Sequence, residues 1–175
     1  FVKHAKSAGA SASLLVTPYY NKPSQEGLYL HFKKIADACK DLHTYLYNIP
    51  GRSIVKINSD IVKKLSRVHN IVGVKDATAD LTTPLEIRNK CGKNFQQLSG
   101  EDATFLAFLI SGGDGCISVT ANVAPKICSQ IYELWKEGRI IDAMNLNHKI
   151  FPLNQMLFIE SSPCPVKYAL SRMNK

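Results

Sequence analysis

A lysine that ends a short apolar segment is the first residue whose position suggests chemistry. In "NIVGVKDAT" (70–78), the apolar run is typical of a buried strand, and Lys75 and Asp76 follow it directly. Lys75 either marks the return of the chain to solvent or presents a partly desolvated amine as a nucleophile. Desolvation favours the neutral amine. A neutral amine attacks a ketone carbon, and the resulting imine acts as an electron sink.

Imine chemistry also needs proton transfers and, with a keto acid, a group that holds the carboxylate. Tyr47, in "YLYNI" (45–49), carries a phenol hydroxyl that can pass protons between reacting atoms. Arg52 follows the same segment in "PGRS" (50–53), and its planar guanidinium offers two parallel donors to a carboxylate. Lys75, Tyr47 and Arg52 are therefore candidates for one site.

These residues lie where strand-like segments end. Segments of this kind alternate with helical patterns, which predicts a parallel sheet with helices outside it. Polar side chains follow each segment, and the carboxyl ends of parallel strands form the face where α/β proteins build active sites. Taken singly, such side chains have structural explanations, such as stacking for Tyr19 or helix capping for Asp102. The five predicted strands are 13–17, 45–49, 71–75, 95–99 and 116–120.

Apolar stripes and capping residues place the helices between these strands. Ser59 is expected to be the N-cap of one helix, and Pro84 to lie in the first turn of another that ends at Gly92. Pro152 is expected to kink a late helix. The chain opens "FVKHAKSAGA" without a methionine, so we expect it to begin inside a helix and to be part of a longer protein. The other predicted helices cover 24–39, 102–111, 122–137, 139–158 and 164–173.

Alternating strands and helices form either a doubly wound sheet or a barrel. A dinucleotide-binding sheet needs G-x-G-x-x-G directly after its first strand. The nearest match, "GGDGCIS" (112–118), ends in serine and precedes a strand, so it does not fit. The sequence has no P-loop and no HExxH motif, and its five histidines are dispersed, so no metal site is predicted.

Composition restricts the class of protein further. The chain has 175 residues, 45% of them hydrophobic, which suits one domain with a sizeable core. Its net charge of +8 is spread over helix faces without a basic run. Charge is therefore the only feature in favour of a nucleic-acid partner, and none is predicted. Five cysteines without a CxxC pair, and no signal peptide or long apolar run, predict a cytoplasmic protein with reduced thiols and no membrane contact.

Several ordered segments resemble one known family. Together they are similar to the dihydrodipicolinate synthase family, a group of class I aldolases that includes N-acetylneuraminate lyase. The resemblance runs over nearly the whole chain. The segments are "VTPYYNKPSQEGLYLHFKKIA" (16–36), "YNIPGRS" (47–53), "NIVGVKDATADL" (70–81), "LSGEDAT" (98–104), "GGDGCISVTANVAP" (112–125) and "SSPCPVKYAL" (161–170).

The resemblance implies a Schiff-base lyase that condenses pyruvate with aspartate-β-semialdehyde on the way to diaminopimelate and lysine. Lys75 matches the Schiff-base lysine, and Tyr47 matches the tyrosine that donates and accepts protons. Tyr20 matches a tyrosine lent across a subunit interface to the neighbouring site. The implied assembly of the complete protein is a homotetramer. No cofactor is implied beyond the covalent imine.

The remaining implied roles concern substrate binding. Arg52 matches the arginine that binds the carboxylate of the aldehyde, and the backbones of Gly100 and Ile117 match positions that line the pyruvate pocket. Two other interpretations stay open: a truncated, non-catalytic remnant of such an enzyme, or a related pyruvate-dependent aldolase such as N-acetylneuraminate lyase. Arg52 and the "SVTANV" segment favour the synthase over that lyase.

The resemblance also implies an α/β fold, a partial (β/α)8 TIM barrel with the last five of eight strands. The predicted division is a partial barrel over 1–121 and a truncated C-terminal helical region over 122–175. The family's "GTTGE"-type loop, whose threonines bind pyruvate and complete the proton relay, has no counterpart here. The first strand is therefore expected at an unpaired edge of the sheet.

Overall fold

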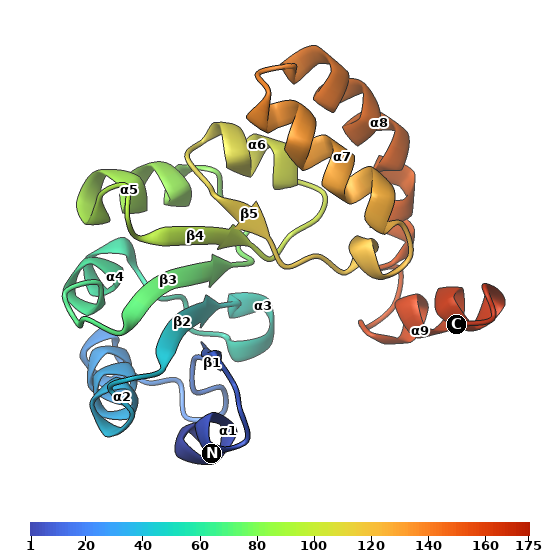
Figure 1. Cartoon of the computed structure of the whole chain (residues 1–175). Helices are drawn as coiled ribbons and strands as arrows, with labels where there is room; N and C mark the ends of the chain where they lie inside the picture. The colour runs from blue at the N-terminus through green and yellow to red at the C-terminus, as the bar shows by residue number, and fades with distance from the viewer.

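The computed structural model describes all residues from Phe1 to Lys175, and its centre is one parallel sheet. The strands follow one another in chain order, each paired in parallel with its neighbour (Figure 1). The predicted α/β fold with consecutive parallel strands is confirmed, and the first strand lies at an edge as expected. The strands are β1 (Ala12–Val16), β2 (His43–Asn48), β3 (Ile71–Asp76), β4 (Gln96–Ser99) and β5 (Gly115–Cys116).

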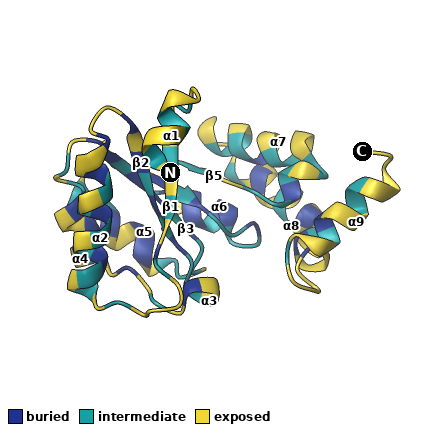
Figure 2. Cartoon of the chain, turned by 90° about the horizontal axis from the view of Figure 1, so that it is seen from below, coloured by how far each residue is buried: buried dark blue, intermediate teal, exposed yellow.

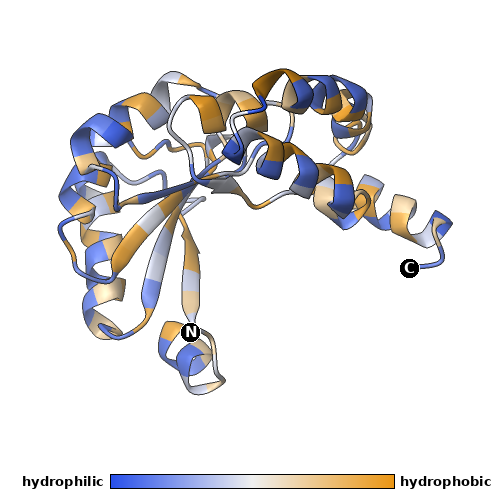
Figure 3. Cartoon of the chain, turned by 45° about the horizontal axis from the view of Figure 1, so that its top comes forward, coloured by the Kyte–Doolittle hydropathy of each residue, from blue (hydrophilic) through white to orange (hydrophobic).

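Helices follow the strands along the outer side of the curved sheet (Figure 3). Two long helices then pack against each other, and a last helix extends away from the sheet (Figure 1). None of the helices is long and apolar enough to cross a membrane. The helices are α1 (Val2–Ser7), α2 (Gln25–Ala38), α3 (Pro50–Ser53), α4 (Ser59–Leu65), α5 (Thr82–Cys91), α6 (Phe105–Ile110), the 3₁₀ turn η1 (Thr120–Asn122), α7 (Pro125–Lys136), α8 (Ile140–Met156) and α9 (Cys164–Arg172).

The two faces of the sheet differ sharply in burial. Alternate strand residues such as Leu46 and Val74 are fully buried in a core of 12 residues that α2, α4 and α5 complete. The other set forms a row across the sheet in which Val16, Tyr47 and Lys75 are register neighbours. On that inner face Leu14 is 42% exposed and Val16 is 40% exposed. The helices therefore cover the outer face and leave the inner face open (Figure 2).

A second, smaller core joins α6 to the C-terminal helices. Phe105 and Leu109 of α6 pack with Ile131 of α7 and with Ala143 and Ile150 of α8. These helices enclose their apolar stripes among themselves, as amphipathic helices do. The helix after β4 is thus connected to both the sheet and the long helices beyond it.

Three local predictions were wrong at their boundaries. The strand expected at 116–120 is only two residues long, because the amides of Val119 and Thr120 donate to Asp102 instead of continuing the sheet. Asn58, not Ser59, is the N-cap of α4, and its side chain accepts a bond of 2.9 Å from the amide of Ile61. Asp102 does not cap α6, which begins at residue 105.

Other helix boundaries follow the sequence signals. Pro84 lies in the first turn of α5, where its missing amide hydrogen is tolerated. Gly92 ends that helix with a φ of 81°, a conformation that favours glycine. Pro152 lies inside α8, which continues as one helix from Ile140 to Met156.

Candidate active site

Lys75 and Tyr47 meet at the carboxyl ends of β3 and β2. They are direct register partners, and both side chains are half-buried on the open inner face. The Nζ atom of Lys75 lies 4.3 Å from the centre of the Tyr47 ring. This distance is within the range of an ammonium–π contact, which extends to about 6 Å. The structure thus brings together the two residues that the sequence analysis placed at the centre of the chemistry.

Gly100 lies directly against the lysine. A Cβ atom added at this position would be 2.8 Å from the Cε atom of Lys75 and 2.8 Å from the Cβ atom of Ala77. Any side chain here would therefore displace the lysine or the turn after β3. The amide of Gly100 donates to the carbonyl oxygen of Asp76 at 2.6 Å, which keeps the two strand ends together.

Asp76, next to the lysine, points to the opposite face and is buried. Its carboxylate accepts bonds from the Asn48 amide at 2.9 Å and from the Thr78 hydroxyl at 2.6 Å. The Asn48 side-chain oxygen in turn accepts a bond of 3.0 Å from the amide of Ile57. With these partners, Asp76 is an anchor between β2 and β3 and not a free base.

Arg52 lies in α3, directly after β2, and its side chain is exposed. Its Nη2 atom donates a hydrogen bond of 2.8 Å to the carbonyl oxygen of Ser162, in the connection between α8 and α9. A guanidinium has five donors, so this bond leaves others free. Sequence reasoning missed this partner, because a backbone carbonyl has no residue-type signature.

The other two predicted site residues, Tyr20 and Ile117, are more exposed than Lys75 and Tyr47. Tyr20 is 88% exposed in the loop after β1 and makes no hydrogen bond within the chain. Ile117 follows β5, is 41% exposed, and donates its amide to the carbonyl oxygen of Ser99 at 2.9 Å. The structure therefore places Ile117 beside the end of β4 and leaves Tyr20 without a partner in this chain.

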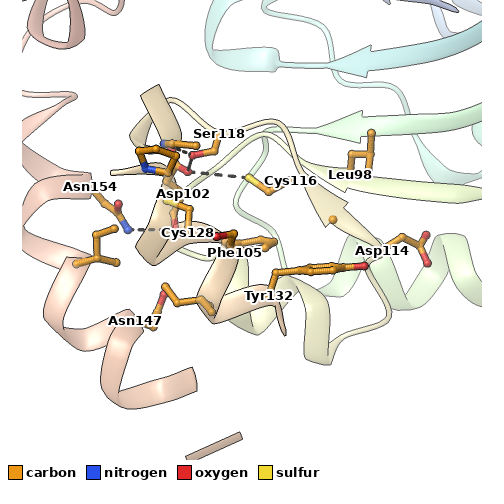
Figure 4. Close-up of a pocket in the computed structure, with 16 residues that line it drawn as sticks. Leu98, Asp102, Phe105, Asp114, Cys116, Ser118, Cys128, Tyr132, Asn147 and Asn154 are labelled. Carbon is orange, nitrogen blue, oxygen red and sulfur yellow. Dashed lines mark hydrogen bonds between the residues drawn. The ribbon is translucent and has the colours of Figure 1, made fainter. Parts of the chain in front are cut away.

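A cavity of about 390 Å³ lies beside this region, between β5 and the helices α7 and α8 (Figure 4). Its lining includes the thiols of Cys116 and Cys128 but neither Lys75 nor Tyr47. Burial raises the pKa of both thiols, and the nearby Asp102 carboxylate raises it further. Protonated thiols are poor nucleophiles, so this cavity does not compete with Lys75 as a reactive centre.

Five consecutive parallel βα units define a partial (β/α) barrel, and the candidate lysine and tyrosine lie at the carboxyl ends of its neighbouring strands. The chain belongs to the dihydrodipicolinate synthetase family, whose family model matches residues 1–174.

Named relatives agree with this assignment. The 4-hydroxy-tetrahydrodipicolinate synthase of Rhodospirillum centenum is 54% identical over 173 residues, which cover 99% of this chain and 59% of that protein. The synthase of Bradyrhizobium diazoefficiens is 51% identical over 173 residues, which cover 99% of this chain and 58% of that protein. The chain thus spans less than two thirds of the length of these relatives.

Solved structures show the same relationship in three dimensions. The dihydrodipicolinate synthase of Acinetobacter baumannii, solved in complex with pyruvate, has a TM-score of 0.94 and 46% identity. The matched region covers 98% of this chain and 59% of the Acinetobacter baumannii chain. The synthase of Thermotoga maritima also has a TM-score of 0.94, with 38% identity and the same two coverages.

Proposed function

We propose that the protein containing this chain is a lyase that forms a Schiff base between Lys75 and pyruvate. The enamine derived from it condenses with aspartate-β-semialdehyde to give 4-hydroxy-tetrahydrodipicolinate, for lysine and diaminopimelate synthesis. The observation that carries the proposal is the lysine amine 4.3 Å from the Tyr47 ring centre, on the inner face at the strand ends. The names of the relatives, and the pyruvate bound to the Acinetobacter baumannii protein, support the substrate class.

In this proposal Lys75 is the nucleophile. Its neutral amine attacks the ketone carbon of pyruvate to give a carbinolamine. A proton delivered to the carbinolamine hydroxyl lets it leave as water, and a protonated imine remains. Loss of a proton from the pyruvate methyl group then gives an enamine, whose carbon attacks the aldehyde. Tyr47 transfers protons in these steps, because it is the register partner of Lys75 on the neighbouring strand and carries a phenol hydroxyl. The covalent imine is the only electron sink required.

Substrate binding in this proposal uses the surrounding backbone and one cation. Gly100 and Ile117 line the pyruvate pocket with main-chain groups, and Arg52 binds the carboxylate of the aldehyde. The free donors of the Arg52 guanidinium suit that role. Tyr20, exposed in this chain, is offered to the site of a neighbouring subunit in a homotetramer. Five free cysteines support a cytoplasmic location.

A second candidate is a non-catalytic protein of the same family. For the 175-residue chain by itself, the exposure of Leu14 and Val16 favours this candidate, because an open inner face admits water beside Lys75. Water at the amine stabilises the ammonium form and opposes imine formation.

Trapping with borohydride tests the proposal. The full-length protein is mixed with pyruvate, reduced with borohydride, and digested for mass spectrometry. We expect the reduced adduct on Lys75 and its loss in Lys75→Arg, while the control Lys93→Arg keeps it. An adduct on another lysine, or one that persists in Lys75→Arg, would contradict the proposed role. No adduct at all would favour the non-catalytic candidate.

A further inference from the structure

Asp102 is a buried carboxylate that none of the proposed catalytic roles uses. It lies two residues after Gly100, in the connection from β4 to α6, and is only 7% exposed. No lysine or arginine forms an ion pair with it. A buried charge without an ionic partner needs several hydrogen-bond donors, and these donors reveal what the carboxylate holds in place.

The oxygen and nitrogen donors to the Asp102 carboxylate all come from the segment after β5, and the Cys116 thiol of β5 lies 4.0 Å from Oδ1. The amides of Val119 and Thr120 donate to Oδ2 of Asp102 at 2.9 Å and 3.0 Å, and the Ser118 hydroxyl donates to Oδ1 (Figure 4). The Ser118 oxygen in turn accepts a bond of 2.8 Å from the amide of Ala121. Asp102 thus holds the Ser118 side chain and the backbone amides of the next two residues, and these two amides are therefore unavailable to extend β5.

A second buried side chain locks the same arrangement from the far side. Asn154 of α8 is 4% exposed, and its Nδ2 atom donates to the backbone carbonyl of Asp102 at 3.2 Å. Its Oδ1 atom accepts a bond of 2.8 Å from the hydroxyl of the buried Thr120. One amide side chain therefore joins the connection after β4, the segment after β5 and a helix of the C-terminal region.

The two backbone positions assigned to the pyruvate pocket are held together through this network. Gly100 is two residues before Asp102 in the chain and lies against the Cε atom of Lys75. Ile117 is bonded to Ser99 through its own amide, and the next three residues are bonded to Asp102. The bond between Ile117 and Ser99 joins the two strand ends directly, and Asp102, itself held by Asn154, ties the residues after each of them together.

We propose that Asp102 and Asn154 are positioning residues for pyruvate: they hold the Gly100 and Ile117 backbones at the separation that the keto acid requires beside Lys75. The inference rests on the proposed function. Neither residue touches the reacting atoms. Small displacements of positioning groups strongly reduce productive binding. Loss of either residue should therefore weaken the binding of pyruvate. It should not affect the aldehyde, because the proposed partner of the aldehyde, Arg52, lies on α3.

The test compares Asp102→Asn with Asp114→Asn in the full-length protein. Asp114 is a matched control, because its carboxylate also accepts a bond from a backbone amide, that of Gln97 at 2.7 Å. It lies directly before β5 and is paired with Arg88. The first readout is the pyruvate concentration that gives half-maximal borohydride trapping on Lys75. The second is the KM for the aldehyde, and the third is Tm.

For Asp102→Asn we expect the half-saturating pyruvate concentration to rise about tenfold or more, because an amide NH₂ replaces one accepting oxygen. The aldehyde KM stays within about twofold, since Arg52 is not involved. In Asp114→Asn both values stay near wild type even if Tm falls. Asn154→Ala removes only the bonds of Asn154 to the Asp102 carbonyl and the Thr120 hydroxyl. We expect it to raise the half-saturating pyruvate concentration less than Asp102→Asn does. It replaces Asp102→Asn as the test variant if that variant does not fold.

Two results would overturn the inference. One is unchanged pyruvate half-saturation in Asp102→Asn, or in Asn154→Ala if Asp102→Asn does not fold, whatever happens to Tm. The other is an equal rise in the control Asp114→Asn, which would mean a general loss of stability. Absence of any Lys75 adduct in the wild-type protein would overturn the proposed function as well, so failure of the two proposals is distinguishable.

Discussion

The guanidinium of Arg52 donates to the carbonyl oxygen of Ser162 at 2.8 Å, across 110 residues of sequence. This bond joins the short helix after β2 to the connection between the last two helices. It directs the arginine without neutralising it, because a carbonyl carries no net charge. Arg52 therefore remains available to bind an anion.

Replacing Arg52 should affect the aldehyde substrate selectively. In the full-length protein, Arg52→Lys is expected to raise the KM for aspartate-β-semialdehyde about tenfold or more, because a lysine cannot offer two parallel donors. Trapping of pyruvate on Lys75 should stay near wild type. Arg67→Lys, at an exposed arginine after α4, is the control and should change neither value. A selective loss of pyruvate trapping would show that Arg52 serves the keto acid instead.

Gly100→Ala should damage the lysine site through crowding alone. The new methyl group would lie 2.8 Å from Cε of Lys75, so the side chain has to move. We expect borohydride trapping with pyruvate to fall about tenfold or more. Gly51→Ala is the matched control, because a Cβ at Gly51 meets nothing within 4 Å. Trapping by Gly100→Ala at the wild-type rate would mean that the lysine does not need this space.

The 175-residue chain purified alone should not catalyse the condensation at a detectable rate. Its inner sheet face is open at Leu14 and Val16, so water reaches the site and can hydrolyse an imine that forms there. The measurement is product formation from pyruvate and aspartate-β-semialdehyde, with a full-length relative assayed in parallel. Turnover within about tenfold of that relative would show that the chain already positions its proton-transfer groups adequately.

Acid should destabilise the chain in part through Asp80. Its carboxylate accepts bonds from the Thr82 hydroxyl at 2.6 Å and from Lys56 at 2.9 Å, and these partners hold the pKa of Asp80 well below its usual range. The stabilisation is fully present above the pKa of the unfolded state, about 3.9, and is lost as the pH falls toward the folded-state value.

Urea unfolding at neutral pH and at about pH 3 checks this prediction. Asp80→Asn should lower the free energy of unfolding at neutral pH and reduce the loss between the two pH values. Glu160→Gln, at an exposed carboxylate without an ion pair, is the control and should behave like wild type. An acid response in Asp80→Asn as steep as that of wild type would assign the effect to other groups.

Local patterns in the sequence predict most of the fold. The apolar runs around Leu46 and Val74 mark strands because those side chains are buried under helices. The alternation of strands and helices predicts the parallel order, and that order places Lys75 beside Tyr47. The predicted division of the chain at residue 121 stays a prediction, and so do the catalytic roles.

What the sequence did not predict depends on bonds between distant segments. Asp102 looked like a helix cap, but its donors lie 16 to 18 residues later, and they shorten β5. Asn154 contacts Asp102 over 52 residues of sequence. Propensity describes what a residue does with its neighbours in the chain, so a buried carboxylate that bonds a remote loop has no local signature.

The order of the strands also bears on how the protein is made. Among these five strands, each pairs only with the strand just before or after it in the chain. This order lets a nascent chain add one βα unit at a time as it leaves the ribosome. Amide hydrogen exchange in this chain should then be slowest in β2, β3 and β4, which have partners on both sides, and fastest in β1 and β5.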